Sequence, residues 1–280
     1  MPIALYGSEV WGIGKQHRDS DPFEHLQYKF IKEILGIHCK ASNAACLAEL
    51  NRLPLYTRIE FSAIKYWLHI LESNNSLALK IYKATEKNNS WIINMKNLIS
   101  RLGFHFINLN PIDIKMYLKH IQERINDIAF QKQETDINQN KKMNFFNILY
   151  KPNKRPSYVD QCKSKSDRST LCKLRLSAHT LSIERGRYLK IPRQNRVCLC
   201  CNNGDIEDEL HFLLKCSSYK YVRDNLIKKL NNVLLNNKFS SLSYNLLISI
   251  LNSNSQTILK IVVNYLNECL LVRNSLLKGT

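Results

Sequence analysis

The sequence contains little glycine and little proline, with 8 and 7 of these residues among 280. Sheet proteins with many tight turns need both, because glycine adopts left-handed backbone angles and proline fixes the first position of a turn. Long stretches rich in Leu, Ile, Lys, Glu and Asn occur instead. The composition predicts a mainly α-helical protein, and its 44% hydrophobic residues are enough to form a core.

Long apolar runs are also absent. A helix needs about 18 to 20 consecutive apolar residues to cross a bilayer. The most apolar stretch, near the C-terminus, is interrupted by Lys260, Asn264, Asn267 and Glu268. The apolar start at residues 1–5 is too short for a signal peptide. We therefore expect an intracellular protein, in the nucleus or the cytoplasm, with no membrane partner.

Acidic residues are scarce relative to basic ones. The 41 Lys and Arg exceed the 23 Asp and Glu, which gives a formal net charge of +18. This excess is larger than solubility requires, so it indicates an anionic partner. Residues 151–200 contain thirteen Lys or Arg but only three acidic residues. This distribution favours RNA or DNA as the partner.

Apolar residues recur every three or four positions in seven segments, as they do on the buried face of a helix. These segments predict helices at residues 22–36, 54–71, 77–84, 91–102, 111–128 and 221–230, and at the C-terminus. In the last segment the repeating residues face a core or, as an alternative, recruit a protein partner. They are Ile258, Val262, Tyr265, Cys269, Val272 and Leu276.

The periodic pattern is lost at residues 131–142, which are mostly polar. We therefore predict a helical domain at residues 1–130 and a linker at residues 131–150. A basic segment follows at residues 151–225, and helices occupy residues 226–280.

Four of the chain's nine cysteines lie within nineteen residues, whereas the others follow no spacing rule. Scattered thiols in a reducing compartment are usually small buried hydrophobes. The cluster includes Cys198 and Cys201, separated by two residues, and then His211 and Cys216. Three thiolates and an imidazole form the tetrahedral ligand set of a structural zinc ion. We therefore predict one structural Zn²⁺ and no catalytic residues at this site.

Two alternatives remain for this cluster. The three cysteines can be buried thiols beside a hydrogen-bonded histidine, without a metal. Cys200 can also compete with Cys201 for the ion, although the two-residue spacing favours Cys201. The acidic residues Glu207, Asp208 and Glu209 are predicted to cap a helix that starts near His211, where negative charge meets the positive end of the helix dipole.

The sequence around the cluster resembles the C-terminal zinc-knuckle region of non-LTR (LINE-type) retrotransposon reverse transcriptases. The resemblance rests on Arg185–Arg187, Ile191–Arg193, Arg196, the paired cysteines, Ile206–Glu209, His211–Leu214, Cys216, Tyr219 and Arg223. The start of the chain resembles the thumb-like helical segment after the polymerase palm. That similarity rests on Leu5–Gly12, Phe30–Ile31, Ile34–Gly36, Glu49–Leu50 and Arg52–Leu55.

The resemblance implies a thumb-like helical domain followed by a CCHC zinc knuckle that holds nucleic acid during reverse transcription. Enzymes of this family bind two Mg²⁺ ions through adjacent aspartates, and the sequence contains no such pair. We therefore expect a fragment of such an enzyme, with the palm missing and no polymerase activity by itself.

We expect the basic and aromatic residues around the cluster to contact RNA or DNA. Lys and Arg bind phosphates without reading sequence, and tyrosines stack on unpaired bases. The candidates are Arg185, Arg187, Tyr188, Arg193, Arg196, Tyr219 and Arg223. The alternative function is a helical protein-interaction module in which zinc only stabilises the scaffold. A hydrolase is a third class, but the sequence shows no carboxylate and histidine grouping that supports it.

Overall fold

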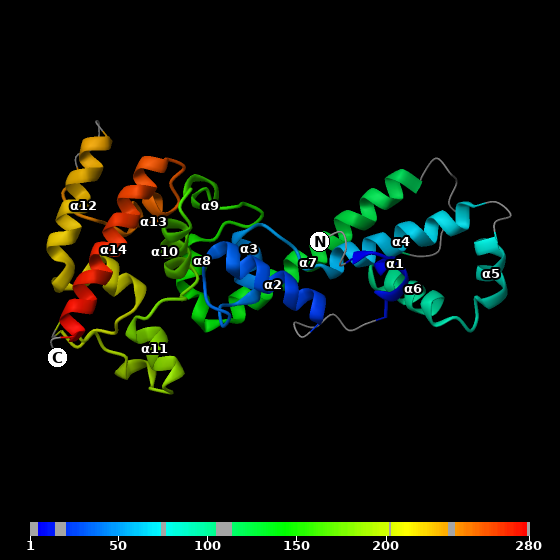
Figure 1. Ribbon diagram of the computed structural model, residues 1–280, viewed down its shortest axis with the longest axis horizontal. Coiled ribbons are helices and arrows are strands. Elements are labelled where there is room, and N and C mark those ends of the chain that lie inside the picture. The colour runs from blue at the N-terminus through cyan, green and yellow to red at the C-terminus, as the bar shows by residue number, and fades with distance from the viewer. Residues whose placement is uncertain are drawn as a thin grey trace. The chain divides into compact units, whose positions relative to one another are not determined.

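The computed structural model describes residues 5–14, 21–73, 77–104, 114–201, 203–234 and 239–278. The fold is mainly α-helical, which confirms the prediction from composition (Figure 1). Within the described ranges, β pairing is limited to one isolated antiparallel bridge between Val197 and Ile206.

The helices divide between two compact units. Unit 1 contains residues 1–28 and 52–135, and unit 2 contains residues 29–51 and 136–280. The division falls inside α2 (Pro22–Leu35) and α7 (Ile114–Gln139). Each unit therefore combines segments that are distant in the sequence, which the predicted division into consecutive segments did not anticipate.

The seven helices predicted from periodicity are present, although Pro111, the predicted start of one, lies outside the described residues. The periodicity missed seven further α-helices, most of which are short and have few turns to display a repeat. These are α1 (Ser8–Trp11), α3 (Asn43–Glu49), α8 (Asn144–Leu149), α9 (Tyr158–Gln161), α10 (Lys165–Arg175), α11 (Ser182–Tyr188) and α13 (Tyr244–Leu251).

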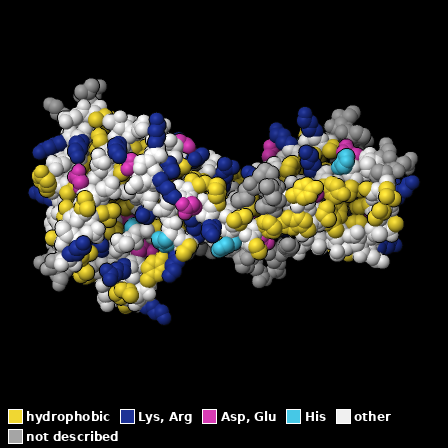
Figure 2. All heavy atoms as spheres, viewed as in Figure 1, with side chains coloured by type: hydrophobic (Ala, Val, Ile, Leu, Met, Phe, Trp, Pro, Cys, Tyr) yellow, Lys and Arg dark blue, Asp and Glu magenta, His cyan; other side chains and the backbone are white. Residues whose placement is uncertain are grey.

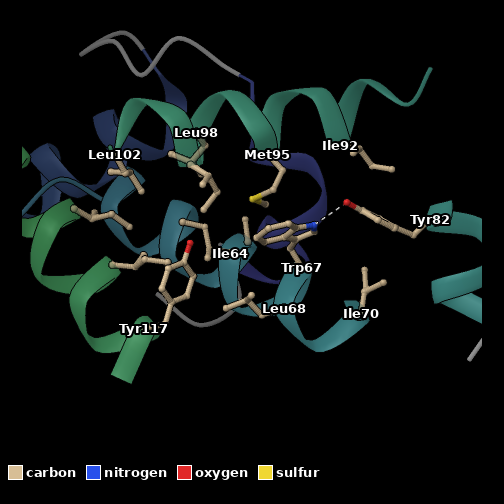
Figure 3. Packing of buried hydrophobic residues seen from close by; sticks show 14 residues of the cluster. Ile64, Trp67, Leu68, Ile70, Tyr82, Ile92, Met95, Leu98, Leu102 and Tyr117 are labelled. Atoms are coloured by element: carbon tan, nitrogen blue, oxygen red, sulfur yellow. Dashed lines mark hydrogen bonds between the residues drawn. The ribbon is translucent and has the colours of Figure 1, made fainter. Parts of the chain in front are cut away.

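The core of unit 1 lies between three helices and the first part of α7. Figure 3 shows the indole of Trp67 beside Met95, with its Nε1 donating a hydrogen bond of 3.4 Å to the Tyr82 hydroxyl. Ile64 and Ile121 are fully buried in the same cluster. The three helices are α4 (Tyr56–Glu72), α5 (Leu77–Thr85) and α6 (Ser90–Arg101).

A buried carboxylate fixes the beginning of α4. Glu24 accepts hydrogen bonds from the backbone N–H groups of Leu55 and Tyr56, at 3.1 and 2.7 Å. The first N–H groups of a helix have no partner within the helix and carry partial positive charge. The carboxylate therefore satisfies groups that burial would otherwise leave unpaired.

In unit 2, the long helix α14 (Gln256–Lys278) is the central element. It packs against α9, α10, α13 and α12 (Lys220–Val233). The first four residues of its predicted apolar stripe, Ile258, Val262, Tyr265 and Cys269, are buried. These four residues therefore face the core of unit 2 and are not available to a protein partner.

The linker predicted at residues 131–150 is helical over most of its length, so that prediction is wrong. Helix α7 continues to Gln139, and α8 begins at Asn144. The buried face of α7 continues through Ala129, Gln133 and Ile137 at four-residue intervals. Gln133 is polar, but its amide N–H donates to the Arg52 carbonyl at 3.3 Å. This partner allows a polar residue to occupy the buried face, so the helix continues although the apolar pattern is interrupted.

A buried ion pair joins α3 to α10 in unit 2. Arg175 donates from Nε to Glu49 at 2.5 Å, and both side chains are almost fully buried. The Tyr158 hydroxyl donates to the same carboxylate at 2.7 Å. Burial and the neighbouring Cys172 and Glu49 raise the pKa of Tyr158, so its hydroxyl keeps its proton. The carboxylate is therefore surrounded by donors.

We predict that Glu49→Ala destabilises unit 2 by about 3 to 5 kcal/mol, because it leaves the Arg175 guanidinium buried without its carboxylate. The double variant Glu49→Ala with Arg175→Met should lose less stability than the single variant, since it removes both charges. Urea unfolding followed by far-UV circular dichroism measures the difference. A single variant as stable as the double variant would contradict the prediction.

Candidate metal centre and basic surface

A short backbone pairing positions the first two ligands. The Cys198 N–H donates to the Asp205 carbonyl at 2.8 Å, and the Glu207 N–H donates to the Arg196 carbonyl at 3.0 Å. These bonds flank the bridge between Val197 and Ile206. The chain reverses between the two segments of this pairing, and we call residues 196–207 the cysteine hairpin. Gly204 has a φ of 73°, a left-handed angle that glycine adopts without strain.

The other two ligands lie at the two ends of one wide helical turn, η5 (His211–Lys215). It is π-helical, and the Cys216 N–H donates to the His211 carbonyl at 2.8 Å. The turn begins with a cap, because Asp208 accepts the His211 N–H at 2.8 Å. This spacing of five residues brings His211 and Cys216 to the same side of the turn.

The four predicted ligands converge. The ligand atoms of Cys198, Cys201, His211 and Cys216 all lie within 4.8 Å of one another, and all four residues are buried. The Cys198 and Cys216 sulfurs are 3.8 Å apart, and the Cys201 sulfur is 3.3 Å from His211 Nε2. A tetrahedron with metal–sulfur bonds of about 2.3 Å requires sulfur separations of about 3.8 Å. The group can therefore hold one metal ion.

Burial favours the protonated form of two of the thiols in this group. It raises the pKa of Cys198 and of Cys216. A metal ion binds the thiolate, so its binding must displace protons from these sulfurs. His211 presents Nε2 to the sulfurs, while its Nδ1 lies 3.5 Å from Asp205 Oδ2. A carboxylate on this side favours the tautomer that leaves Nε2 free to bind a metal.

The cysteine hairpin is attached to the rest of unit 2 by Glu207. Its carboxylate accepts hydrogen bonds from Arg273 Nε and Nη2, at 2.6 and 2.8 Å. The N–H and hydroxyl of Ser182 each donate to it at 2.6 Å. Burial opposes ionisation of Glu207, but the Arg273 and Ser182 bonds outweigh it and lower its pKa. The hairpin, α11 and α14 therefore meet at one charged carboxylate.

The acidic cluster only partly follows the prediction that it caps a helix. Asp208 caps the turn at His211, but Glu207 binds Arg273, and Glu209 accepts from Ser177 and His179, at 2.5 and 3.0 Å. The two glutamates are buried and thus need partners from other segments. Sequence reasoning missed this role, because their cationic and hydroxyl partners lie far away in the chain.

Cys200 lies next to the predicted site but in a different grouping. Its sulfur is near Cys198 and the Glu207 carboxylate, and it is partly exposed. Glu207 already binds Arg273 and Ser182 with both oxygens, so this second grouping offers a poorer ligand set. The four ligands chosen by spacing are thus the ones that also share a buried site.

The predicted nucleic-acid contacts divide into exposed and structural residues. Arg185 and Arg193 are exposed, and Tyr188 is 51% exposed, with Lys40 Nζ 5.4 Å from the centre of its ring. Arg187 is half-buried and forms an ion pair of 2.9 Å with the buried Glu184. Helix α11 and the following turn η4 (Arg193–Asn195) carry these residues.

Three of the predicted contacts have structural roles in unit 2. Tyr219 is fully buried with its ring 5.0 Å from that of Phe212, so the prediction that it stacks on a base is wrong. Arg196 donates to the Ile191 and Ile183 carbonyls, at 2.9 and 3.0 Å. Arg223 donates to the carbonyl of the ligand Cys216 at 2.6 Å. Both guanidinium groups fix loops, which proximity in sequence to the cysteines did not reveal.

No protein-family model, curated protein or solved structure matches this chain. Among the described residues, no single helix is both long and apolar enough to cross a membrane. The pair α13 and α14 passes this test together, on length and composition, but the two helices are bent by 116°.

We predict that Cys216→Ser abolishes metal binding, whereas Cys200→Ser leaves one ion per chain. Only the first variant removes a member of the buried four-ligand group. Titration of each reduced, metal-free variant with Co²⁺ distinguishes them through the absorption bands of tetrahedral cobalt thiolates. Loss of the bands in Cys200→Ser, with retention in Cys216→Ser, would reverse the assignment.

Proposed function

We propose that the four-ligand group holds a structural zinc ion. Three thiolates and one imidazole are soft and borderline donors, a set that selects zinc over magnesium or calcium. The separation of the Cys198 and Cys216 sulfurs supports tetrahedral coordination, which four protein ligands complete. No position is then left for a reactive water, so the ion serves the fold of the cysteine hairpin and η5.

We further propose that unit 2 binds single-stranded nucleic acid through the surface of α11 and η4. The observation that carries this proposal is the exposed group of Arg185, Tyr188, Lys190 and Arg193 beside the cysteine hairpin. Cations on such a surface neutralise phosphates, and an exposed tyrosine ring can stack on a base. Figure 2 shows Lys and Arg outnumbering Asp and Glu on the visible face of unit 2.

The exposed residues are supported by a close backbone contact. The Arg196 side chain crosses Gly186, where an added Cβ would lie 2.6 Å from Arg196 Cγ. Arg196 also binds the Ile183 carbonyl in α11. The cysteine hairpin therefore holds α11 directly, and loss of the ion should loosen the surface that carries the arginines.

This role agrees with the resemblance to the C-terminal region of non-LTR retrotransposon reverse transcriptases. We propose that the chain serves nucleic-acid binding in such a system and has no polymerase activity by itself. The alternative, a zinc-stabilised protein-interaction module, is less well supported, because the first part of the apolar stripe of α14 is buried within unit 2.

For the metal, we expect one zinc per chain in protein purified without chelators. Removal of zinc should raise amide hydrogen exchange between Arg196 and Tyr221, because the hairpin loses its cross-link, while α6 in unit 1 serves as the internal control. Elemental analysis and exchange measured by mass spectrometry test this. Full zinc content in the double variant Cys198→Ser with His211→Ala would refute the assignment.

For nucleic acid, we expect the affinity for single-stranded RNA to fall steeply as salt rises. Arg185→Gln with Arg193→Gln should weaken binding and reduce the slope of log K against log salt by about 0.7 for each phosphate that the variant no longer neutralises. The control, Arg52→Gln with Arg58→Gln, removes the same charge from exposed positions in unit 1. Fluorescence anisotropy measures both effects.

Two results would contradict the nucleic-acid proposal. If the unaltered chain binds no RNA at low salt, the proposed nucleic-acid-binding function is wrong. Equal weakening in the two double variants would show that the arginines of α11 and η4 contribute only general charge.

A further inference from the structure

A small basic pocket lies in unit 2, between the loop that joins α8 to α9 and the turn that joins α13 to α14. Its volume is about 130 Å³. None of the residues that line it is acidic. The cations and amides among them are Lys151, Lys154, Arg155, Arg175, Asn252 and Asn254.

Two of the four cations in this lining are already neutralised. Arg175 is paired with Glu49, and Arg155 forms an ion pair of 3.0 Å with Asp160. Lys151 and Lys154 are exposed, and neither has a carboxylate partner among the described residues. The pocket therefore carries about two unit charges that are available to an anion.

Two asparagines add neutral donors. Asn252 Oδ1 accepts from Arg175 Nη1 at 3.0 Å, and Asn254 Oδ1 accepts from the Ser157 hydroxyl. These bonds use the amide oxygens, so the Nδ2 groups of both side chains are left to donate. A site with ammonium and amide donors and no carboxylate is suited to a phosphate group, whose oxygens only accept.

The loop that carries the lysines is ordered by its own sequence. Pro152 and Pro156 restrict its backbone angles. The Lys154 N–H donates to the Lys151 carbonyl at 3.2 Å, and Asn153 takes a left-handed φ of 56°. The Asn153 carbonyl in turn accepts from Asn51 Nδ2 at 3.4 Å. The lysines are thus attached to a fixed turn, which lowers the entropic cost of binding an anion.

We infer that this pocket binds a phosphate group, and that its physiological source is a phosphodiester of a nucleic-acid backbone. The second half of the inference rests on the proposed function. It adds to the surface of α11 and η4 a second contact, in a separate segment of unit 2. Free phosphate is the other possible source of the same chemistry, and competition between pyrophosphate and RNA separates the two.

The first measurement titrates the full, zinc-loaded chain with pyrophosphate and follows backbone amides by NMR. We expect shifts at residues 151–157 and 252–255. Two variants should weaken pyrophosphate binding by about tenfold each, since each removes or opposes a charged hydrogen bond. These are Lys151→Gln with Lys154→Gln, and Asn254→Asp, which keeps the side chain's shape but adds a carboxylate.

The control is Lys220→Gln with Lys228→Gln, which removes the same charge from exposed positions on α12. This control should leave the affinity for pyrophosphate within about twofold of the unaltered chain. Unchanged amide signals at residues 151–157 would overturn the assignment of this pocket as a phosphate site. An equal loss of pyrophosphate affinity in the control and in the pocket variants would overturn it as well.

The second measurement adds single-stranded RNA to the pyrophosphate complex. We expect RNA to displace pyrophosphate from the same amides and the two pocket variants to bind RNA more weakly than the control. RNA that binds without displacing pyrophosphate would overturn the phosphodiester source and assign the pocket to free phosphate. If the unaltered chain binds no RNA at all, the proposed function fails. The pyrophosphate titration still decides, independently, whether the pocket binds a phosphate group.

Discussion

The buried ion pair between Glu207 and Arg273 connects the parts of unit 2 on which the candidate site depends. Glu207 follows the bridge that closes the cysteine hairpin, and its carboxylate also receives two hydrogen bonds from Ser182 at the start of α11. Arg273 belongs to α14, the central helix of the unit. A carboxylate buried to this extent is stable only with several donors. The hairpin, α11 and α14 therefore have one mutual arrangement that satisfies it.

The need of a buried carboxylate for nearby donors also accounts for how charge is distributed in unit 2. Four of its glutamates are almost fully buried, and each has a cationic or histidine partner nearby: Glu49 with Arg175, Glu184 with Lys142 and Arg187, Glu207 with Arg273, and Glu209 with His179. Burial of these carboxylates leaves the basic surplus of the sequence on the surface. Part of this surplus lies on α11, η4 and the loop between α8 and α9, where the two proposed phosphate contacts occur.

The proposed metal site is held both by local backbone structure and by arginine side chains that bind the surrounding loops. Local pairing and the π-helical turn place the four ligands, while Arg223 and Arg196 hold the surrounding loops through backbone carbonyls. Zinc would then close a loop of about nineteen residues from Cys198 to Cys216, which reduces the conformational freedom of the unfolded chain. The exposed surface of α11, which carries Arg185, would depend on this closure, because Arg196 joins the hairpin to α11.

The sequence by itself determined the helices with several apolar repeats and the four residues of the candidate metal site. Both are local patterns, since a repeat along one helix or a two-residue spacing between cysteines needs no knowledge of distant segments. Only the tertiary structure decided that Tyr219 is buried, that Arg196 and Arg223 bind backbone carbonyls, and that residues 131–139 continue α7 past the buried Gln133, whose amide N–H donates to the Arg52 carbonyl. The pocket around Lys151 was equally hidden. Each of these outcomes depends on a partner from another segment of the chain or on burial by other helices, and a local pattern contains neither.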